Sequence, residues 1–368
     1  MSGFVPPPYP YDRLDGLREL IAERHGDLVD LSVGTPFDPP PNAVVEALGG
    51  SGTERSYPPS VGRADLLDAV RRWNERRFGV ELGRGQVAAT IGSKEFVASV
   101  PRFLSLRDPS RDTVLAPAIA YPSYAMGATL AGLRSVEVPL DESGRLDLRA
   151  VSADDAERAL LLWSNSPGNP TGALDDLGAA ADWGRRHGVP VFSDECYVEF
   201  TWTDRPRTIL EHGLDGVVAV HSLSKRSNLA GVRTGFYAGD AELVDYLREV
   251  RKHAGMMVPG PAQSAAVAAL DDDDHVDVQR GRYRSRLERL AAVIGDWSGI
   301  DVHTPGGAFY LWIECGDGWE FAERLARDGG ALVSPGEFYG TAGSAHVRVA
   351  VVQPDERIDL VADRLRSA

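Results

Sequence analysis

The stretch from Ser222 to Gly235 reads Ser-Leu-Ser-Lys-Arg-Ser-Asn-Leu-Ala-Gly-Val-Arg-Thr-Gly, and the expected fold follows from it. It places one lysine, Lys225, among small hydroxyl residues, soon after the apolar run Gly-Val-Val-Ala-Val at 216–220. Such a run is typical of a buried strand, and ligands of open α/β sheets bind beyond the carboxyl ends of the strands. We therefore predict an α/β protein in which Lys225 lies at a ligand site.

The residues around Lys225 indicate what the ligand is. An amine that is partly removed from water has a lowered pKa and becomes a nucleophile that forms a Schiff base with an aldehyde. Ser222, Ser224 and Arg233 suit a phosphate, because hydroxyls and a guanidinium fork donate to its oxygens. Pyridoxal phosphate carries both groups, although the same residues could form a basic, serine-rich surface loop. Ser-x-Ser-Lys followed by arginine eight residues later resembles the cofactor-lysine signature of the fold-type I aminotransferases, class I/II.

The composition fits a soluble globular protein with a sizeable core. Of 368 residues, 43% are hydrophobic and 25% are charged, and there is no apolar run of the roughly 18 residues that a membrane span needs. The net charge of −15 argues against nonspecific binding to nucleic acid or anionic membranes. Cys196 and Cys315 form no C-x-x-C pair, and the run Asp271–Asp274 lacks metal-ligand spacing, so no metal site is expected. Because the first residues lack the regions of a secretory signal, we expect a cytoplasmic protein.

Apolar runs and helical spacings alternate along the chain. Strands are expected near 28–33, 88–91, 113–117, 159–164, 189–193, 216–220, 232–238 and 346–352, long helices at 64–77, 241–251 and 275–298, and a loop at 332–340. The resemblance implies a mostly parallel seven-stranded central sheet in a large domain, with a smaller α+β domain. A proline- and glycine-rich stretch after residue 251 suggests a boundary. We expect residues 1–42 to form an arm and part of the small domain, 43–258 the large domain and 259–368 the carboxyl-terminal small domain.

Two segments that follow predicted strands supply further cofactor candidates. Gly92-Ser93-Lys94 leads from a strand into a helix, and backbone N–H groups at a helix start bind anions, so Ser93 and Lys94 are candidate phosphate ligands. Capping alone would also explain the serine. Tyr121 in Tyr-Pro-Ser-Tyr124 can stack on a pyridine ring, and the resemblance favours Tyr121 over Tyr124; core packing is the alternative for both.

Two more strand exits match the family by position. Asn-Pro-Thr-Gly at 169–172 implies that Asn169 bonds the cofactor's phenolic oxygen and lies near the substrate carboxylate, although the same residues could be an ordinary turn. Asp194 matches the aspartate that keeps the pyridine nitrogen protonated, which makes the ring a stronger electron sink. Tyr197 matches the tyrosine on the phenolic oxygen. Independent coincidence of all these signals, in the family's order, is not credible.

The remaining candidates concern the substrate and a second chain. Gly34, in Gly-Thr-Pro-Phe-Asp, matches the glycine that lies against the substrate carboxylate. Arg348 in His-Val-Arg-Val-Ala matches the arginine that forks onto that carboxylate, whereas most strand arginines face solvent. Tyr57, followed by Gly62, resembles the tyrosine that reaches the neighbouring subunit's cofactor phosphate, so the resemblance implies a homodimer with shared active sites.

The resemblance implies a ping-pong Schiff-base mechanism in which Lys225 holds pyridoxal phosphate and then moves protons, while Asp194 stabilises the cationic ring. It is closest to the N-succinyldiaminopimelate aminotransferases of bacterial lysine biosynthesis, through the phrases at 30–36, 90–95, 193–197, 221–231 and 251–259. The expected substrates are therefore small amino acids and 2-oxo acids: glutamate and N-succinyl-2-amino-6-oxopimelate. The remote succinyl carboxylate needs a cation, for which Lys94, Arg226 and Arg13 are candidates.

Three other functions are alternatives to this one. The first is an aminotransferase of other specificity, for aspartate or aromatic amino acids. The second is a C–S lyase on the same fold, which would also need Lys225 and Asp194. The third is the cofactor-sensing domain of a transcription regulator, for which the roughly 30 residues before the first fold motif are too few to form a helix-turn-helix domain.

Overall fold

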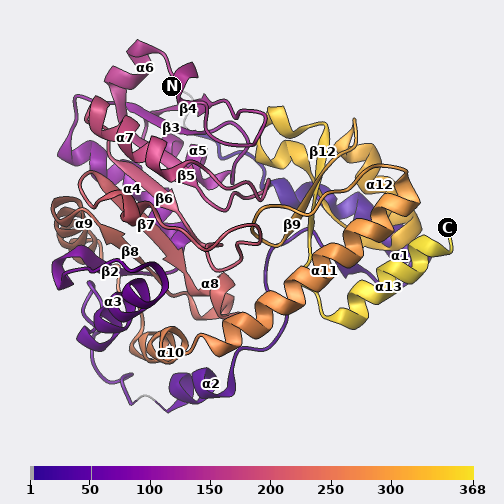
Figure 1. The fold of residues 1–368 in the computed structure, drawn as a ribbon, viewed down its shortest axis with the longest axis horizontal. Coiled ribbons are helices and arrows are strands. Elements are labelled where there is room, and N and C mark those ends of the chain that lie inside the picture. The colour runs from indigo at the N-terminus through magenta and orange to yellow at the C-terminus, as the bar shows by residue number, and fades with distance from the viewer. Residues whose placement is uncertain (1–3, 51) are drawn as a thin grey trace.

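A seven-stranded sheet forms the centre of the larger part of the molecule (Figure 1). The computed structural model describes residues 4–50 and 52–368, so the first three residues of the expected arm, and Ser51, lie outside the described part. In spatial order the strands are β2 (Val87–Thr90), β8 (Gly235–Gly239), β7 (Val217–Ser222), β6 (Val191–Asp194), β5 (Ala159–Asn165), β3 (Thr113–Pro117) and β4 (Arg134–Val138). Only β8 runs against its neighbours. The expected mostly parallel seven-stranded sheet is therefore confirmed.

The strand directions bring the predicted motifs to one edge. Because β2 pairs antiparallel with β8, and β8 pairs antiparallel with β7, β2 runs in the same direction as β7. The carboxyl ends of β2, β3, β5, β6 and β7 therefore meet at a single edge of the sheet. Every residue of β5, β6 and β7 is buried, as expected for strands that are covered on both faces.

Helices cover both faces of this sheet. The large part contains α2 (Asn42–Gly49), α3 (Ala64–Phe78), α4 (Ser93–Arg107), α5 (Ser123–Leu130), α6 (Ala153–Arg158), α7 (Leu177–His187), α8 (Leu223–Arg226), α9 (Ala241–His253) and α10 (Gly260–Leu270). One core joins α4, α5 and α9 to alternate strand residues such as Trp163 and Val220, and the other joins α3, α7 and α10 to Leu162 and Ala219. The period-two alternation of side chains along each strand divides the residues between these two cores.

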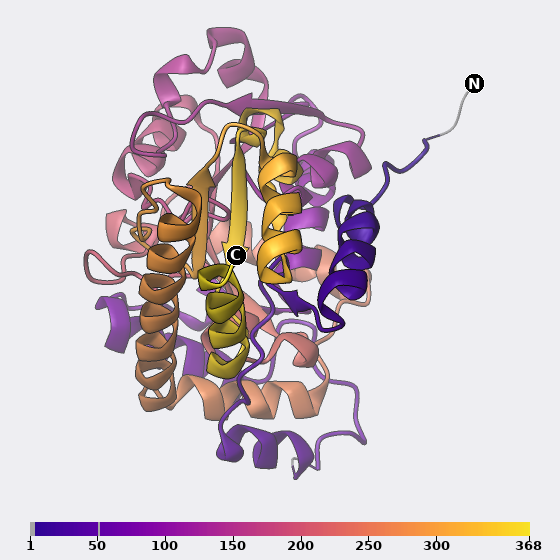
Figure 2. The ribbon, with the colours of Figure 1, turned by 90° about the vertical axis from the view of Figure 1, so that its right-hand side faces the viewer.

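A second body packs around a three-stranded antiparallel sheet of β11 (Ser334–Pro335), β12 (His346–Ala350) and β9 (Tyr310–Glu314). A parallel pair, β1 (Val29–Asp30) with β10 (Ala331–Leu332), lies beside it. Its helices are α1 (Asp15–His25), α11 (Asp274–Ser298), α12 (Gly318–Gly329) and α13 (Asp355–Arg366). From the end of the molecule, α13 lies between α11 and α12, and α1 lies beyond α12 (Figure 2). This is the smaller α+β body that the resemblance implies.

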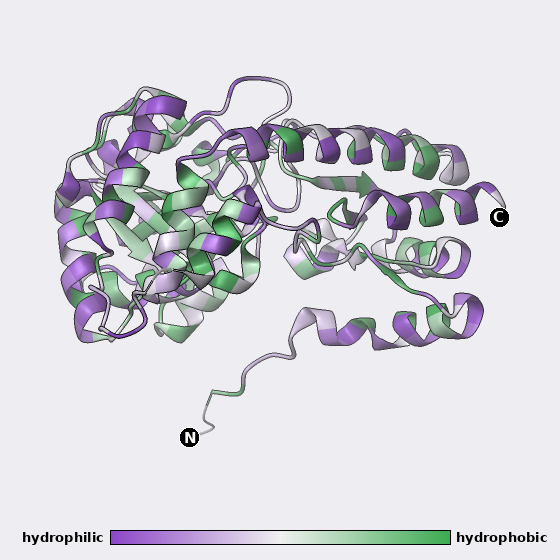
Figure 3. Cartoon of the chain, turned by 90° about the horizontal axis from the view of Figure 1, so that it is seen from below, coloured by the Kyte–Doolittle hydropathy of each residue, from purple (hydrophilic) through white to green (hydrophobic). Residues whose placement is uncertain are grey.

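These helices are amphipathic. Their surfaces carry both hydrophilic and hydrophobic residues (Figure 3), and their apolar sides, including Leu287, Leu325 and Val361, pack in one core with the strands. The 25-residue helix α11 starts beside α10 and crosses to the smaller body, where it ends at Gly299 with a left-handed φ of 73°. Among the described residues, no helix combines the length and the apolar character needed to span a bilayer.

The structure differs from the sequence expectations mainly at short elements. The stretch 332–340 was expected to be a loop, but it contains β11 and part of β10, followed by the 3₁₀ turn Gly336–Tyr339. The expected strand at 28–33 is reduced to β1, and the strand expected at 232–238 starts only at Gly235. Two-residue strands carry no detectable alternation of polar and apolar residues, so a sequence pattern does not reveal them.

Candidate active site

A cavity of about 390 Å³ opens at the carboxyl edge of the large sheet, against the smaller body. Its walls contain every predicted site residue except Tyr57: Gly34, Ser93, Lys94, Tyr121, Asn169, Asp194, Tyr197, Ser222, Ser224, Lys225, Arg233 and Arg348. The sequence thus predicted residues that lie far apart in the chain and share one cavity in the fold.

Lys225 lies in the single turn α8, directly after β7. Its Nζ donates a hydrogen bond to the carbonyl oxygen of Gly34 and lies 5.9 Å from the centre of the Phe309 ring. Burial is the main cause that lowers the pKa of the Lys225 amine to about 8. It outweighs the opposing effects of Cys196 and Asp194, and the nearby cations Arg348 and Arg233 act in the same direction as burial. A larger fraction of this amine is therefore neutral near pH 7 than of an ordinary lysine amine.

Asp194 ends β6 and has 8% of its surface exposed. Its carboxylate accepts hydrogen bonds from the hydroxyl of Tyr124 at 2.9 Å and from the backbone N–H of Cys196 at 3.2 Å. Burial raises the pKa of Asp194, and the bonds from Cys196 and Tyr124 offset only part of that rise. A cation that approached this carboxylate would keep it ionised.

One end of the cavity is built for an anion. The helix α4 begins at Ser93 and therefore points free N–H groups into the cavity, and Ser222 and Ser224 are on the neighbouring turn. Arg233 lies in the left-handed region at φ 57°, and its Nη1 donates a hydrogen bond to the carbonyl oxygen of Ala230 at 2.8 Å. A Cβ at position 92 would collide with the Arg233 guanidinium, so glycine is required there.

The opposite end holds Arg348, a buried cation on β12 with 2% of its surface exposed. Its Nη1 donates to Oδ1 of Asn169 at 2.7 Å, and its Nη2 donates to the carbonyl oxygen of Ser32. The guanidinium carbon lies 4.2 Å from the ring centre of Tyr310 and 4.7 Å from that of Tyr339. The buried Nε has no hydrogen-bond partner among the described residues. An anion beside Arg348 would therefore find a donor that the protein leaves unused.

Tyrosines line the middle of the cavity. The hydroxyls of Tyr197 and Tyr310 lie 2.9 Å apart, and burial, followed by the contact with Tyr310, raises the pKa of Tyr197. Tyr197 therefore stays protonated at physiological pH and can donate to an oxygen of a ligand. The backbone N–H of Asn169 donates to Oδ1 of Asn165 at 2.8 Å, which fixes the turn that carries the Asn169 side chain.

Lys94 lies at the mouth of the cavity between two aromatic rings. Its Nζ is 5.2 Å from the ring centre of Tyr9 and 5.5 Å from that of Tyr121. Burial lowers the pKa of Lys94, but the hydroxyls of Tyr121 and Tyr9 more than offset this, so the net pKa is raised. No carboxylate in the described part of the chain lies within ion-pair distance of this ammonium group.

Two of the three cations proposed for a remote carboxylate lie elsewhere. Arg226 is buried between Glu199 and Asp273 and does not line the cavity, so the hypothesis that it contacts substrate is wrong. The Arg13 side chain pairs with Glu337 at 2.6 Å and does not line the cavity either. Tyr57 is 95% exposed, so its proposed contact with a second subunit stays a prediction.

Sequence reasoning missed several residues of the cavity. Tyr121 was preferred over Tyr124 as the stacking ring, and no contact with Asp194 was expected, yet the Tyr124 hydroxyl bonds Asp194. Its spacing of three residues from Tyr121, at the start of a helix, was the available signal. Tyr11 on the arm belongs to none of the predicted motifs, but its hydroxyl accepts a hydrogen bond from Nη2 of Arg348 at 3.3 Å. Tyr310 and Cys196 also line the cavity, and only the tertiary fold brings them there.

The arrangement can hold a ligand that has an anion at one end and a second anion at the other, with a reactive amine between them. Arg233, the serines and the start of α4 serve the first anion, and Arg348 serves the second. Lys225 and Asp194 supply a nucleophilic base and a carboxylate in the same space. Such a set suits a phosphorylated aldehyde and an α-carboxylate.

Comparisons with known proteins agree with this geometry. Residues 26–365 match the sequence model of aminotransferase class I and II. A probable aminotransferase of Mycobacterium tuberculosis is 41% identical over 98% of this chain and 85% of its own length. The 4-dedimethylamino-4-oxo-anhydrotetracycline transaminase OxyQ of Streptomyces rimosus is 39% identical over 98% of this chain and 99% of its own. An LL-diaminopimelate aminotransferase of Aquifex aeolicus is 34% identical over 99% and 97%.

A solved structure shows the same fold. A probable N-succinyldiaminopimelate aminotransferase from Thermus thermophilus superposes with a TM-score of 0.86, at 33% identity, over 97% of this chain and 99% of that chain. Both bodies of the molecule and the edge between them are therefore shared with this relative.

Proposed function

The chain belongs to the class I and II aminotransferase family, and from that premise we propose that it exchanges an amino group between glutamate and N-succinyl-2-amino-6-oxopimelate. The products would be 2-oxoglutarate and N-succinyl-LL-2,6-diaminopimelate, as part of diaminopimelate and lysine biosynthesis. The observation that carries the choice of substrate is Lys94, a cation in the cavity that no described carboxylate neutralises.

Pyridoxal phosphate is the cofactor of this family, and the residues of the cavity fit it. Arg233 has donors left over, and the Gly92 position leaves room for its guanidinium. Ser93, Ser222, Ser224 and the backbone N–H of Lys94 would hold the phosphate together with Arg233. Tyr121 would lie on the face of the ring, and Asp194 would face its nitrogen.

When bound, the cofactor supplies an aldehyde that combines reversibly with amines and a ring that accepts the negative charge left on the substrate Cα. Lys225 Nζ would take the proton from the substrate Cα and deliver it to C4′ of the cofactor. The lowered pKa of the Lys225 amine favours this role. Asp194 would hold a cationic ring nitrogen, with Tyr124 keeping the carboxylate in place. Asn169 and the protonated Tyr197 would donate to the phenolic oxygen.

Arg348 would bind the substrate α-carboxylate. Its guanidinium lies over the rings of Tyr310 and Tyr339, which restrict its position. The planar guanidinium can form two parallel hydrogen bonds to a carboxylate. Gly34 would lie close to the same carboxylate, because it lines the same cavity as Arg348. A side chain at position 34 would collide with the Tyr310 ring, so glycine suits this place. Substrate orientation would thus come from β12 and from the loop after β1.

The substrate of the second half of the exchange carries a carboxylate far from its reacting carbon. Lys94 would bind it, since the other two candidate cations are already paired with protein carboxylates. The similarity to the Thermus thermophilus and Aquifex aeolicus proteins, whose names refer to diaminopimelate compounds, supports this assignment.

A second candidate substrate is a large cyclic ketone. It is favoured by the similarity to the Streptomyces rimosus transaminase, whose name refers to a tetracycline precursor, over nearly the whole of both chains. The exposed face of Tyr9 beside Lys94 would then pack against the rings of the acceptor instead of flanking a carboxylate site.

The test is a screen of half-reactions followed by the absorbance of the bound cofactor. We expect glutamate and N-succinyl-LL-2,6-diaminopimelate each to convert the aldehyde form to the amine form. Conversion by glutamate alone, followed by amination of a cyclic ketone and not of the succinylated 2-oxo acid, would contradict the proposed substrate. Release of pyruvate from cystathionine would point to a C–S lyase.

We further propose that the chain forms a homodimer in which Tyr57 completes the partner's phosphate site. Its 95% exposure and the exposure of Val45 leave this surface available for a second chain. Sedimentation of the cofactor-bound protein would test the dimer.

The domain boundaries proposed at residues 42 and 258 also stay a prediction. The packing of α10 against α2 and α3 favours placing the second of these boundaries near Asp271.

A further inference from the structure

Arg226 follows Lys225 directly, yet its side chain leaves the cavity and enters the protein. Only 4% of Arg226 is exposed, and it does not line the cavity. Residues that are adjacent in a helical turn point about 100° apart, so one turn can direct Lys225 toward the ligand and Arg226 toward the core. The large cost of burying a guanidinium requires a matching set of partners.

That set comes from two separate elements. On one side, Nε of Arg226 donates to Oε1 of Glu199 at 3.2 Å. On the other, Nη2 donates to Oδ1 of Asp273 at 2.6 Å, and Nη1 donates to the carbonyl oxygen of Ala269 at 2.5 Å. The guanidinium is thus held between the segment after β6 and the turn that joins α10 to α11.

Both carboxylates are themselves fixed. Glu199, with 2% exposure, also accepts from Nε1 of Trp73 at 2.9 Å and from Nη2 of Arg77 at 2.6 Å, both on α3. Asp273 also accepts from Nε of Arg76 at 2.6 Å. The helix α3 therefore supports both partners of Arg226, and the charges within the cluster alternate in sign. Such a network is rigid only while all its members are present.

The turn that carries Lys225 has little support of its own. The helix α8 has four residues, too few to be stable without tertiary contacts. Its amino end is continuous with β7, and Leu223 packs in the core of the large body. Near its carboxyl end, the Arg226 side chain joins the turn to two separate elements through charged hydrogen bonds. We propose that Arg226 is a positioning residue, which through Glu199 and Asp273 fixes the turn that aims the Lys225 amine into the cavity. This inference rests on the proposed function, because it takes Lys225 as the cofactor lysine.

The consequence concerns the acidity of Lys225. The pKa of its amine is lowered to about 8 chiefly because the amine is buried. If the turn loosens, water reaches the amine, and its pKa rises toward the ordinary value for lysine. Because a cofactor aldehyde combines with the neutral amine, the pH at which capture reaches half of its maximal rate follows that pKa.

The test compares Arg226→Gln with Arg72→Gln in the full-length protein. Arg72 also joins α3 to the α10–α11 turn, through Asp271 at 2.8 Å, but this pair is exposed and does not contact Arg226. For each protein freed of cofactor, the rate of capture of added pyridoxal phosphate is measured against pH. On the reloaded enzyme, kcat and KM for glutamate are measured separately.

For Arg226→Gln we expect the half-maximal pH of capture to rise by about one unit and kcat to fall about tenfold, with KM changed by less than about threefold. Arg226→Lys should restore part of both changes, and Arg72→Gln should match the unchanged protein. An unaltered pH profile in Arg226→Gln, or the same shift in Arg72→Gln, would overturn the inference.

Asp273→Asn provides a milder variant in case Arg226→Gln does not fold. It keeps the size of the side chain and removes the charge that Arg226 Nη2 faces. It should shift the capture profile in the same direction, and an unchanged profile would count against the inference. If the unchanged protein fails to capture the cofactor on Lys225 at all, the proposed function fails instead, so the two failures are distinguishable.

Discussion

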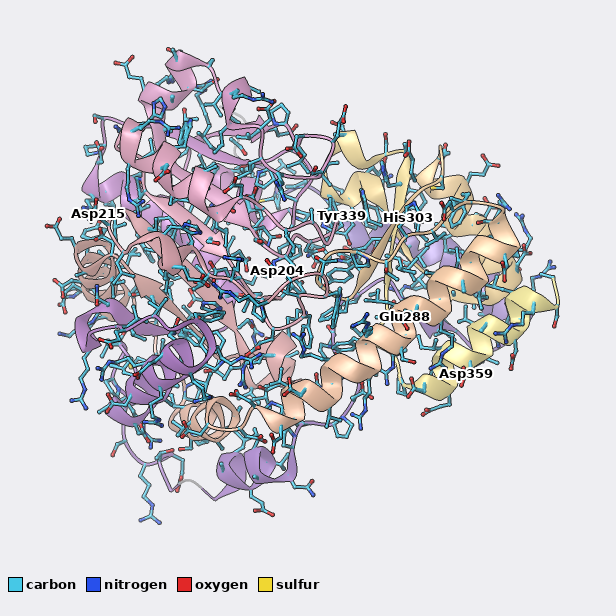
Figure 4. All side chains as sticks on the ribbon, viewed as in Figure 1. Asp204, Asp215, Glu288, His303, Tyr339 and Asp359 are labelled. Atoms are coloured by element: carbon cyan, nitrogen blue, oxygen red, sulfur yellow. The ribbon has the colours of Figure 1, made fainter. Side chains whose placement is uncertain are left out.

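The cavity at the carboxyl edge of the large sheet and a groove at the opposite edge both contain arginines, but the cavity, unlike the groove, holds cations that form no ion pair with a carboxylate of the described residues. The two hollows are comparable in size, about 540 Å³ for the groove and about 390 Å³ for the cavity, and the groove lies beside the starts of β5, β6 and β7. Figure 4 labels one residue near each region: Asp215, which lines the groove, and Tyr339, whose ring packs against Arg348.

The cations of the groove are bound to the protein. Arg111 donates to the carbonyl oxygen of Ala159 at 2.7 Å, Arg185 donates to that of His212 at 2.8 Å, and Arg107 pairs with Glu242 at 3.5 Å. These bonds tie loops together at the amino ends of the strands. The size of a hollow therefore says little about function in this molecule, and the presence of unused donors says more.

The cations of the cavity are different. Among the described residues, Lys94, Lys225, Arg233 and Arg348 form no ion pair with a carboxylate, although they share one small space. The Lys225 amine is partly neutral and the Asp194 carboxylate lines the same cavity, but the remaining cations repel one another, so an anion that binds among them is attracted strongly. The contrast predicts that changes in the cavity affect catalysis strongly and that matched changes in the groove do not.

The largest effect is expected from Lys225→Ala. Loss of the amine removes both the covalent partner of the cofactor and the base, so kcat should fall at least about 10³-fold. The matched control is Arg185→Gln in the groove, which should change kcat by less than about twofold. Retention of more than about a tenth of the activity in Lys225→Ala, measured with glutamate as amino donor, would remove the distinction between the two regions.

Arg348→Lys comes next. Lysine keeps the charge but cannot form two parallel bonds to a carboxylate, so kcat/KM should fall about 10²-fold for every amino donor. Arg111→Lys supplies the same exchange in the groove and should leave kcat/KM unchanged. Steady-state kinetics with glutamate decide the matter, and equal effects of the two exchanges would contradict the role assigned to Arg348.

The pH dependence of cofactor capture sharpens the comparison further. The Lys225 amine, with its pKa lowered to about 8, is protonated and unreactive below that pH and neutral above it. Capture of added pyridoxal phosphate should therefore slow about tenfold for each pH unit below 8 and level off above it. Stopped-flow absorbance measures the rate. A profile centred near pH 10, as for an exposed lysine, would mean that burial does not tune this amine.

The smallest effect is expected from Lys94→Ala. Removal of the ammonium group should raise KM for N-succinyl-LL-2,6-diaminopimelate about tenfold and leave KM for glutamate nearly unchanged, because only the longer substrate reaches it. The two KM values are measured on the same preparation. Equal changes for both substrates would assign Lys94 to a role shared by both halves of the exchange.

Most of the site could be predicted from the sequence because its residues follow buried strands. Asp194 ends β6, Asn169 and Lys225 come soon after β5 and β7, and the carboxyl ends of parallel strands meet at one edge. Apolar runs that are covered on both faces are also the clearest strand signal. The position of each motif at the end of a predicted strand was therefore enough to predict that the motifs lie at one edge of the sheet.

What the sequence could not predict was the direction of individual side chains. Arg226 was one of three candidate cations for the remote carboxylate, but its position one residue after Lys225 directs its side chain into the core, where it bonds Glu199 and Asp273. Tyr124 was the less favoured of two candidate stacking rings, and its hydroxyl bonds Asp194, which is 70 residues away in the chain. Contacts of this kind depend on how helices and sheet pack, and no local pattern encodes them.

The central claim is tested most directly by borohydride treatment of the protein after incubation with pyridoxal phosphate, followed by mass analysis of its peptides. We expect the phosphopyridoxyl mass to be added to the peptide that contains Lys225, and a protein with Lys225→Ala to gain none. Addition of that mass to Lys94 or to another lysine, with the Lys225 peptide unmodified, would contradict it.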